Sequence, residues 1–132
     1  MIYLVQHAEA MTKEQNPDRP LSERGEADAR HLATFLGRGR VTPDAIYHSG
    51  KLRAHQTADV LSEHLTPGLA PEALDGLGAT DPVAPVTARI GEWDGSVMLV
   101  SHLPLVGGLA GALVAGAEDR PPVAFQPGTA VA

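Results

Sequence analysis

The chain of 132 residues has no cysteine, no long apolar run and no excess of positive charge. Without cysteine it forms no disulfide bridges and holds no metal on thiolates. No segment is apolar for long enough to span a bilayer, and no basic-then-apolar leader opens the chain, so we expect a cytoplasmic protein without membrane contact. The formal net charge of -6 argues against a broad nucleic-acid surface, so any anionic ligand must be held by a local cluster of cations.

Short apolar segments alternate with helical patterns, which is typical of an α/β domain. We expect one domain over residues 1–132, built on a mostly parallel sheet. Strands are predicted over 2–6, 45–48 and 96–101, and helices over 23–36, 51–65, 83–92 and from 104 onward. Ser22 is the predicted N-cap of the first helix, and Gly37 and Gly39 are predicted to end it. Residues 66–82 are predicted as a surface loop. The segment 123–132 is predicted as a hairpin whose second strand is cut short, which leaves open a truncated chain end.

Polar side chains follow each of the three predicted strands. Right-handed crossovers place the carboxyl ends of parallel strands at one edge of the sheet, where α/β proteins bind their ligands. An arginine in the first turn of a helix suits phosphate oxygens, and an imidazole beside it can act as a nucleophile. The sequence therefore predicts a phosphate pocket at this edge. The residues concerned are Gln6-His7, His48-Ser49, Arg53 and Ser101-His102.

Four motifs in order along the chain resemble one known family. They are Leu4–Ala8, Arg19–Gly25, Leu52–Ala58 and Val100–Gly107. Together they are similar to the histidine phosphatase (phosphoglycerate mutase-like) superfamily, and the short loop before the third strand resembles the small bacterial phosphohistidine phosphatases of SixA type. The resemblance implies a three-layer sandwich with helices on both faces of the sheet. It also implies a phosphatase that needs no cofactor or metal.

The resemblance assigns roles to individual positions. His7 matches the histidine that accepts the phosphoryl group, and His102 matches the second histidine that contacts its oxygens. Arg53 and Arg19 match phosphate-binding arginines. The family has Arg-His-Gly where this chain has Gln6-His7-Ala8, so Gln6 offers an amide donor to the phosphate but no charge.

The long insertion that carries a general acid in larger family members is absent here. Glu9 and Asp18 are fallback proton donors. Loss of imidazole from phosphohistidine needs less acid assistance than loss of an alcohol, because the leaving group has a pKa of only ~6.5. The predicted function is therefore removal of phosphate from phosphohistidine in a signalling protein, such as a histidine phosphotransfer domain, through a phosphohistidine on His7.

Three alternatives remain open at this point. The first is a small-molecule phosphomonoesterase, whose substrate would be a small phosphorylated compound. The second is a phosphate- or phosphoprotein-binding module whose catalysis weakened when Gln6 replaced arginine. The third is a hydrolase with a metal on His7, His48 and His102, although no carboxylate stands at ligand spacing. Ordinary structural roles also compete: Arg53 can pair with Asp59, and the serines can serve as caps.

Overall fold

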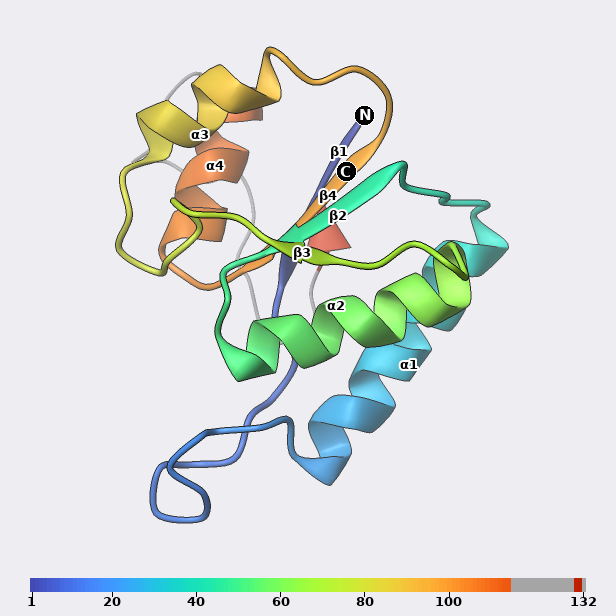
Figure 1. Ribbon diagram of the computed structural model, residues 1–132, viewed down its shortest axis with the longest axis vertical. Helices are drawn as coiled ribbons and strands as arrows, with labels where there is room; N and C mark the ends of the chain where they lie inside the picture. Colours follow the sequence, from blue (N-terminus) through green and yellow to red (C-terminus); the bar gives the residue numbers. More distant parts are fainter. Residues whose placement is uncertain (115–129, 132) are drawn as a thin grey trace.

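The computed structural model describes residues 1–114 and 130–131. Within these residues the strand order of the sheet is β3-β2-β4-β1-β5 (Figure 1). Strands β1, β2, β3 and β4 run parallel, and β5 pairs antiparallel with β1. The strands are β1 (Ile2–Gln6), β2 (Ala45–His48), β3 (Glu72–Ala73), β4 (Val97–Ser101) and β5 (Ala130–Val131). The helices are α1 (Glu23–Arg38), α2 (Leu52–Leu65), α3 (Val83–Ile90) and α4 (Leu105–Val114).

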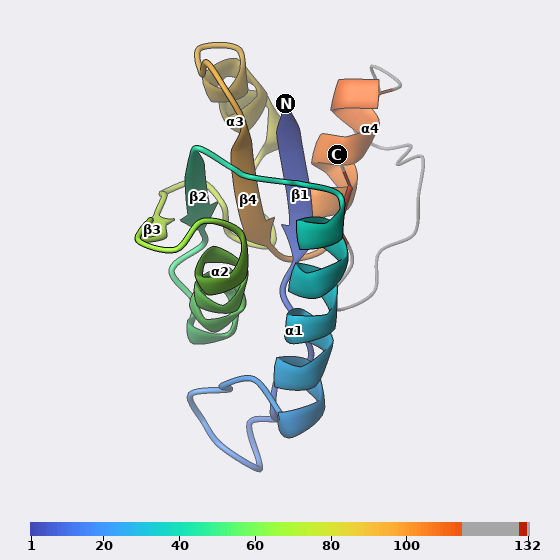
Figure 2. The same ribbon diagram turned by 90° about the vertical axis from the view of Figure 1, so that its right-hand side faces the viewer.

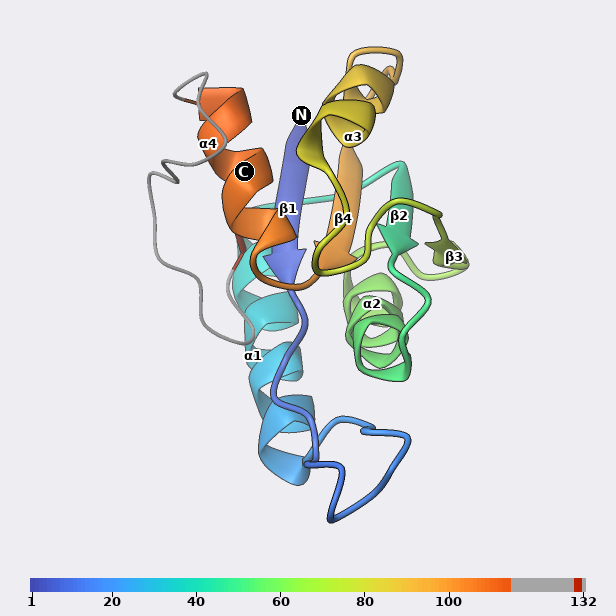
Figure 3. The same cartoon turned by 90° about the vertical axis from the view of Figure 1, so that its left-hand side faces the viewer.

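Helices cover both faces of the sheet, as Figures 2 and 3 show from opposite sides. Side chains alternate along β1, so Leu4 packs into the core cluster formed with α3 and α4, and Val5 packs into the cluster formed with α1 and α2. All five residues of β4 are buried, because this strand lies between β2 and β1 with helices on either face. The predicted α/β fold with two helical layers is confirmed.

The start of α1 follows the predicted capping chemistry. Ser22 is the N-cap, and its hydroxyl accepts a hydrogen bond from the N–H of Gly25 at 3.0 Å. Of the two glycines predicted to end the helix, Gly37 lies within it and Gly39 is its C-cap, so α1 ends at Arg38. Among the described helices, none has the length and apolar character that crossing a membrane requires.

One prediction about the loops is wrong. Residues 66–82 contain the short strand β3, which pairs with β2 at the edge of the sheet. Both residues of β3 are exposed, so no apolar alternation marks the strand in the sequence. The first strand of the hairpin predicted over 123–132 lies outside the described residues, whereas Ala130 and Val131 form β5 against β1.

Strands β1, β2 and β4 point in the same direction, so their carboxyl ends lie at one edge (Figure 2). Val5 and Val100 are register partners, as are His48 and Val100. The residues that follow the strands therefore begin at nearly the same level, which gathers the predicted site residues at that edge.

Candidate active site

His7 directly follows β1, and its backbone N–H donates to the carbonyl of Ser101 at 3.0 Å. Its Nδ1 lies 2.7 Å from the carbonyl oxygen of Ala8. A carbonyl only accepts hydrogen bonds, so Nδ1 carries the proton and donates it. The lone pair of neutral His7 is therefore on Nε2, which suits this nitrogen for attack on an electrophile.

The surroundings keep His7 neutral. Burial lowers the pKa of its imidazole, and the positive charges of Arg53 and Arg19 lower it further, against the opposing effect of the Ala8 carbonyl. A lowered pKa means that the nucleophilic form is the main form at neutral pH.

His102 lies against His7, with the two ring centroids 4.8 Å apart and the planes inclined by 60°. It is buried, and burial lowers its pKa to about 4, together with the neighbouring imidazole of His7 and the cations Arg53, Lys51 and Arg19. It is therefore a neutral ring at physiological pH. Within the described part of the chain, no carboxylate pairs with either imidazole.

Arg53 lies in the first turn of α2, and its buried Nε has no hydrogen-bond partner. Burial, followed by the charge of Arg19, lowers the pKa of its guanidinium, which still leaves it charged at any physiological pH. The alternative pairing with Asp59 is wrong, because Asp59 pairs with His55 at 3.4 Å. Arg53 thus keeps a buried donor for a ligand.

Arg19 has a positive φ of 49°, a backbone conformation that non-glycine residues seldom adopt. Its Nε donates to the carbonyl of Met11 at 3.0 Å. Its positive charge lowers the pKa values of His7, Arg53 and His102. Left-handed backbone at an arginine costs of order 1–2 kcal/mol, so the surrounding loop holds Arg19 there against its local preference.

Two side chains of α2 fasten the site loops to the helix. The hydroxyl of Thr57 accepts from the N–H of Ala8 at 3.1 Å and donates to the carbonyl of Arg53 at 2.8 Å. The amide oxygen of Gln56 accepts from the N–H of Leu21 at 2.7 Å. The Gln-Thr pair of the third sequence motif therefore sets the positions of the loops after β1 and before α1 relative to Arg53.

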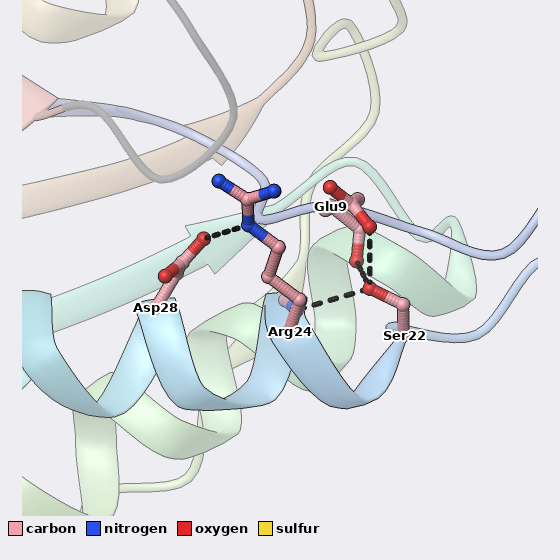
Figure 4. Close-up of polar contacts among 5 residues, drawn as sticks. Glu9, Ser22, Arg24 and Asp28 are labelled. Carbon is pink, nitrogen blue, oxygen red and sulfur yellow. Dashed lines mark hydrogen bonds and ion pairs between the residues drawn. The ribbon is translucent and has the colours of Figure 1, made fainter.

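Figure 4 shows how α1 is fixed to the loop after β1. The hydroxyl of Ser22 donates to a carboxylate oxygen of Glu9 at 3.0 Å, while Arg24 forms an exposed ion pair with Asp28. A Cβ on Gly25 would lie 2.0 Å from the carbonyl oxygen of Glu9, so only glycine permits this approach. The Glu9 carboxylate, expected as a fallback proton donor, is hydrogen-bonded to the cap of α1.

Gln6 is buried at the end of β1 with 8% of its surface exposed, and its Oε1 has no hydrogen-bond partner. Its register partner Ser101 is also buried, and the hydroxyl of Ser101 donates to the carbonyl of Leu77. Gln6 therefore brings a buried amide to the site edge, and Ser101 belongs to the packing of the loop around Leu77.

His48 is at the same sheet edge but has other partners. Its Nδ1 accepts from the N–H of Gly50 at 3.1 Å, and its ring stacks on His55 with centroids 4.5 Å apart. Among residues 1–114 and 130–131, no group of three or more metal-ligating side chains could hold a metal ion. In these residues, His7, His48 and His102 do not form the group of metal ligands that the third alternative requires.

The contact that sequence reasoning missed is between Ser49 and His102. The hydroxyl oxygen of Ser49 lies 2.6 Å from Nε2 of His102. The position of Ser49 after β2 was visible in the sequence, but nothing there distinguished a cap from a partner of an imidazole 53 residues away.

Sequence comparisons match this chain to a known protein family and to a named relative. A model of the histidine phosphatase superfamily (branch 1) matches residues 2–81. Phosphohistidine phosphatase SixA from Escherichia coli (strain K12) is 30% identical over 127 residues, which cover 92% of this chain and 78% of that protein.

Solved structures of similar proteins share the fold. The structure of the protein histidine phosphatase SixA complexed with tungstate superposes with a TM-score of 0.83 at 30% identity, over 96% of this chain and 82% of that chain. A crystal structure assigned as phosphohistidine phosphatase SixA from Agrobacterium tumefaciens has a TM-score of 0.79 at 25% identity, over 98% of this chain and 87% of that chain.

Proposed function

The chain belongs to the histidine phosphatase superfamily and is a phosphatase, and we propose that it removes phosphate from phosphohistidine in a signalling protein. The observation that carries the proposal is the neutral His7, whose Nδ1 is bound to the Ala8 carbonyl and whose pKa is lowered by burial and by two arginines. Those features leave Nε2 as a nucleophile inside a cationic cluster.

The reaction has two steps in this proposal. Nε2 of His7 attacks phosphorus, the P–N bond of the substrate breaks, and the departing imidazole nitrogen takes a proton from solvent. Water then attacks the phosphorus on His7, the second P–N bond breaks, and inorganic phosphate and neutral His7 are released. Arg53 and Arg19 bind the phosphoryl oxygens and stabilise their charge in both transition states, and His102 contacts them from the other side.

Phosphohistidine is the proposed substrate because its leaving group makes the smallest demand on a proton donor. The named relatives are phosphohistidine phosphatases, and in the described residues no carboxylate pairs with the two imidazoles. Imidazole, with a pKa near ~6.5, leaves with less assistance than an alcohol. In this proposal the reaction needs no metal, and the partner is a phosphorylated protein. The cytoplasmic location stays a prediction.

The test compares phosphohistidine on a histidine phosphotransfer domain with alkyl and sugar phosphates, each with and without a chelator. His7→Ala should reduce turnover to the uncatalysed rate, whereas the exposed His31→Ala on α1 should leave it unchanged. Rapid quenching of the wild type should trap an acid-labile phosphoryl group on His7. Equal turnover by His7→Ala contradicts the proposal.

Two other results would favour the alternatives. Faster turnover of alkyl phosphates than of phosphohistidine would indicate a small-molecule phosphomonoesterase. Binding of phosphate by calorimetry, with no turnover of any phosphorylated compound, would indicate a binding module.

A further inference from the structure

Ser49 makes the only side-chain hydrogen bond to His102 that occurs in the described part of the chain. The distance of 2.6 Å between Oγ and Nε2 is short for a neutral pair. Ser49 is half-buried and His102 is buried, so water competes little for this contact. The bond also connects the carboxyl ends of β2 and β4, which are neighbouring strands.

The Ser49 hydroxyl is itself held in place by the turn between β2 and α2. Gly50 adopts a positive φ of 91°, and its N–H donates to Nδ1 of His48 at 3.1 Å. The N–H of Lys51 is directed at the Ser49 oxygen at 3.4 Å. The hydroxyl therefore occupies a fixed position, set by backbone geometry, before any ligand binds.

We propose that Ser49 is a positioning residue that fixes the ring orientation and the tautomer of His102. A neutral imidazole carries one proton on either of two nitrogens, and its ring can turn over. The Ser49 oxygen receives the N–H of Lys51, and among the described contacts its own proton has no acceptor other than Nε2. Donation of that proton to Nε2 favours the tautomer of His102 with its proton on Nδ1, and one orientation of the ring. Because the rings of His102 and His7 are 4.8 Å apart, that orientation decides which nitrogen faces a phosphoryl group on His7. This last step rests on the proposed function, whereas the bond itself does not.

Nitrogen NMR of His102 measures the tautomer directly and needs no substrate. We expect one tautomer in the wild type and in Ser49→Thr, which keeps the hydroxyl, and an averaged mixture of the two in Ser49→Ala. In steady-state turnover of phosphohistidine, Ser49→Ala should lower kcat about tenfold, the effect of one hydrogen bond, with a smaller change in KM. Ser49→Thr should recover most of the kcat.

Ser62→Ala is the matched control. Ser62 is a buried serine of α2 whose hydroxyl donates to the carbonyl of Leu69, so its loss tests the general effect of removing a serine hydroxyl. The His102 tautomer should not change in this variant. A single tautomer with unchanged kcat in Ser49→Ala would overturn the proposal, as would equal losses of kcat in both alanine variants. If the wild type turned over no phosphohistidine, the proposed function would fail, and the NMR result alone would decide the inference.

Discussion

Replacing Gln6 with arginine should increase the activity and decrease the stability of the free protein. Gln6 is 8% exposed and lies directly before His7, with an amide oxygen that has no partner. A charge-assisted hydrogen bond from a guanidinium to a phosphoryl oxygen contributes about 1.5–3 kcal/mol. At about 1.4 kcal/mol per decade, Gln6→Arg should raise kcat/KM by about one to two decades.

The same change should destabilise the protein when no oxyanion is bound. It adds a buried cation to a site that already holds the partly buried Arg53 and Arg19, and a buried charge without a partner costs several kcal/mol. Saturating phosphate or tungstate should recover this loss, so the rise in Tm caused by either oxyanion should be larger in Gln6→Arg than in the wild type.

Steady-state kinetics with phosphohistidine and thermal unfolding with and without phosphate give the two readouts. Gln6→Met, of similar length but without charge or hydrogen-bonding capacity, is the control and should not exceed the wild-type kcat/KM. The reasoning is refuted if Gln6→Arg folds, yet neither its kcat/KM nor its stabilisation by phosphate exceeds the wild-type value.

Three further predictions concern stability and loop geometry. His102 has its ordinary pKa of 6.5 in the unfolded chain and a pKa of about 4 in the folded protein. As the pH falls from 6.5 towards 4, the unfolded state therefore binds the proton first, and the free energy of unfolding decreases. The upper bound is about 3 kcal/mol before solvent screening reduces it, and urea unfolding at several pH values measures it. Gly25→Ala should lower the free energy of unfolding by more than about 2 kcal/mol, since its Cβ would lie 2.0 Å from the Glu9 carbonyl oxygen. Thr57→Val should cost about 1–3 kcal/mol and reduce kcat, because the N–H of Ala8 loses its buried partner.

Each of these predictions has a matched control. His102→Gln should reduce the pH dependence and leave the part contributed by the lowered pKa of His7, and an unchanged slope would contradict the first prediction. Gly37→Ala in the same helix has only a side-chain atom of Leu65 at 3.8 Å and should stabilise by about 1 kcal/mol, so equal effects at both glycines would exclude the contact argument. Thr34→Val removes the same hydroxyl-to-carbonyl bond on the exposed face of α1 and should leave kcat unchanged. A comparable fall of kcat would refute the anchoring role of Thr57.

The sequence predicted those parts of the fold whose signals are local. The apolar run before His7, the cap at Ser22 and the helical spacing over 51–65 each depend on contacts within a few residues, and each matches the structure. The convergence of the strand ends could be predicted from topology, because parallel strands joined by right-handed crossovers all end at the same edge of the sheet. The proximity of His7 and His102 could therefore be predicted without knowing any side-chain contact.

The features that could not be predicted depend on tertiary contacts. Strand β3 consists of two exposed residues whose only sheet signal is backbone pairing with β2. The hydrogen bond from Ser49 to His102 requires the turn geometry at Gly50 and the register of two strands. The sequence does not show which side chains come within hydrogen-bond distance, so Ser49 could not be distinguished from a helix-cap residue.

In the proposed mechanism, Arg53 and Arg19 act on His7 as well as on the ligand. Arg53 and Arg19 lower the pKa of His7, so the cations that attract a phosphoryl group also keep the imidazole unprotonated. The net charge of the chain is -6, yet the local field at His7 is positive. Nearby charges in a partly buried site interact more strongly than distant surface charges, which salt screens. An arginine at position 6 would add to both effects. It would bind the phosphoryl oxygens more tightly and depress the pKa of His7 further, and a less basic imidazole attacks phosphorus more slowly. The lower basicity of His7 therefore limits the gain expected for Gln6→Arg, and we expect a smaller increase in kcat than in phosphate affinity.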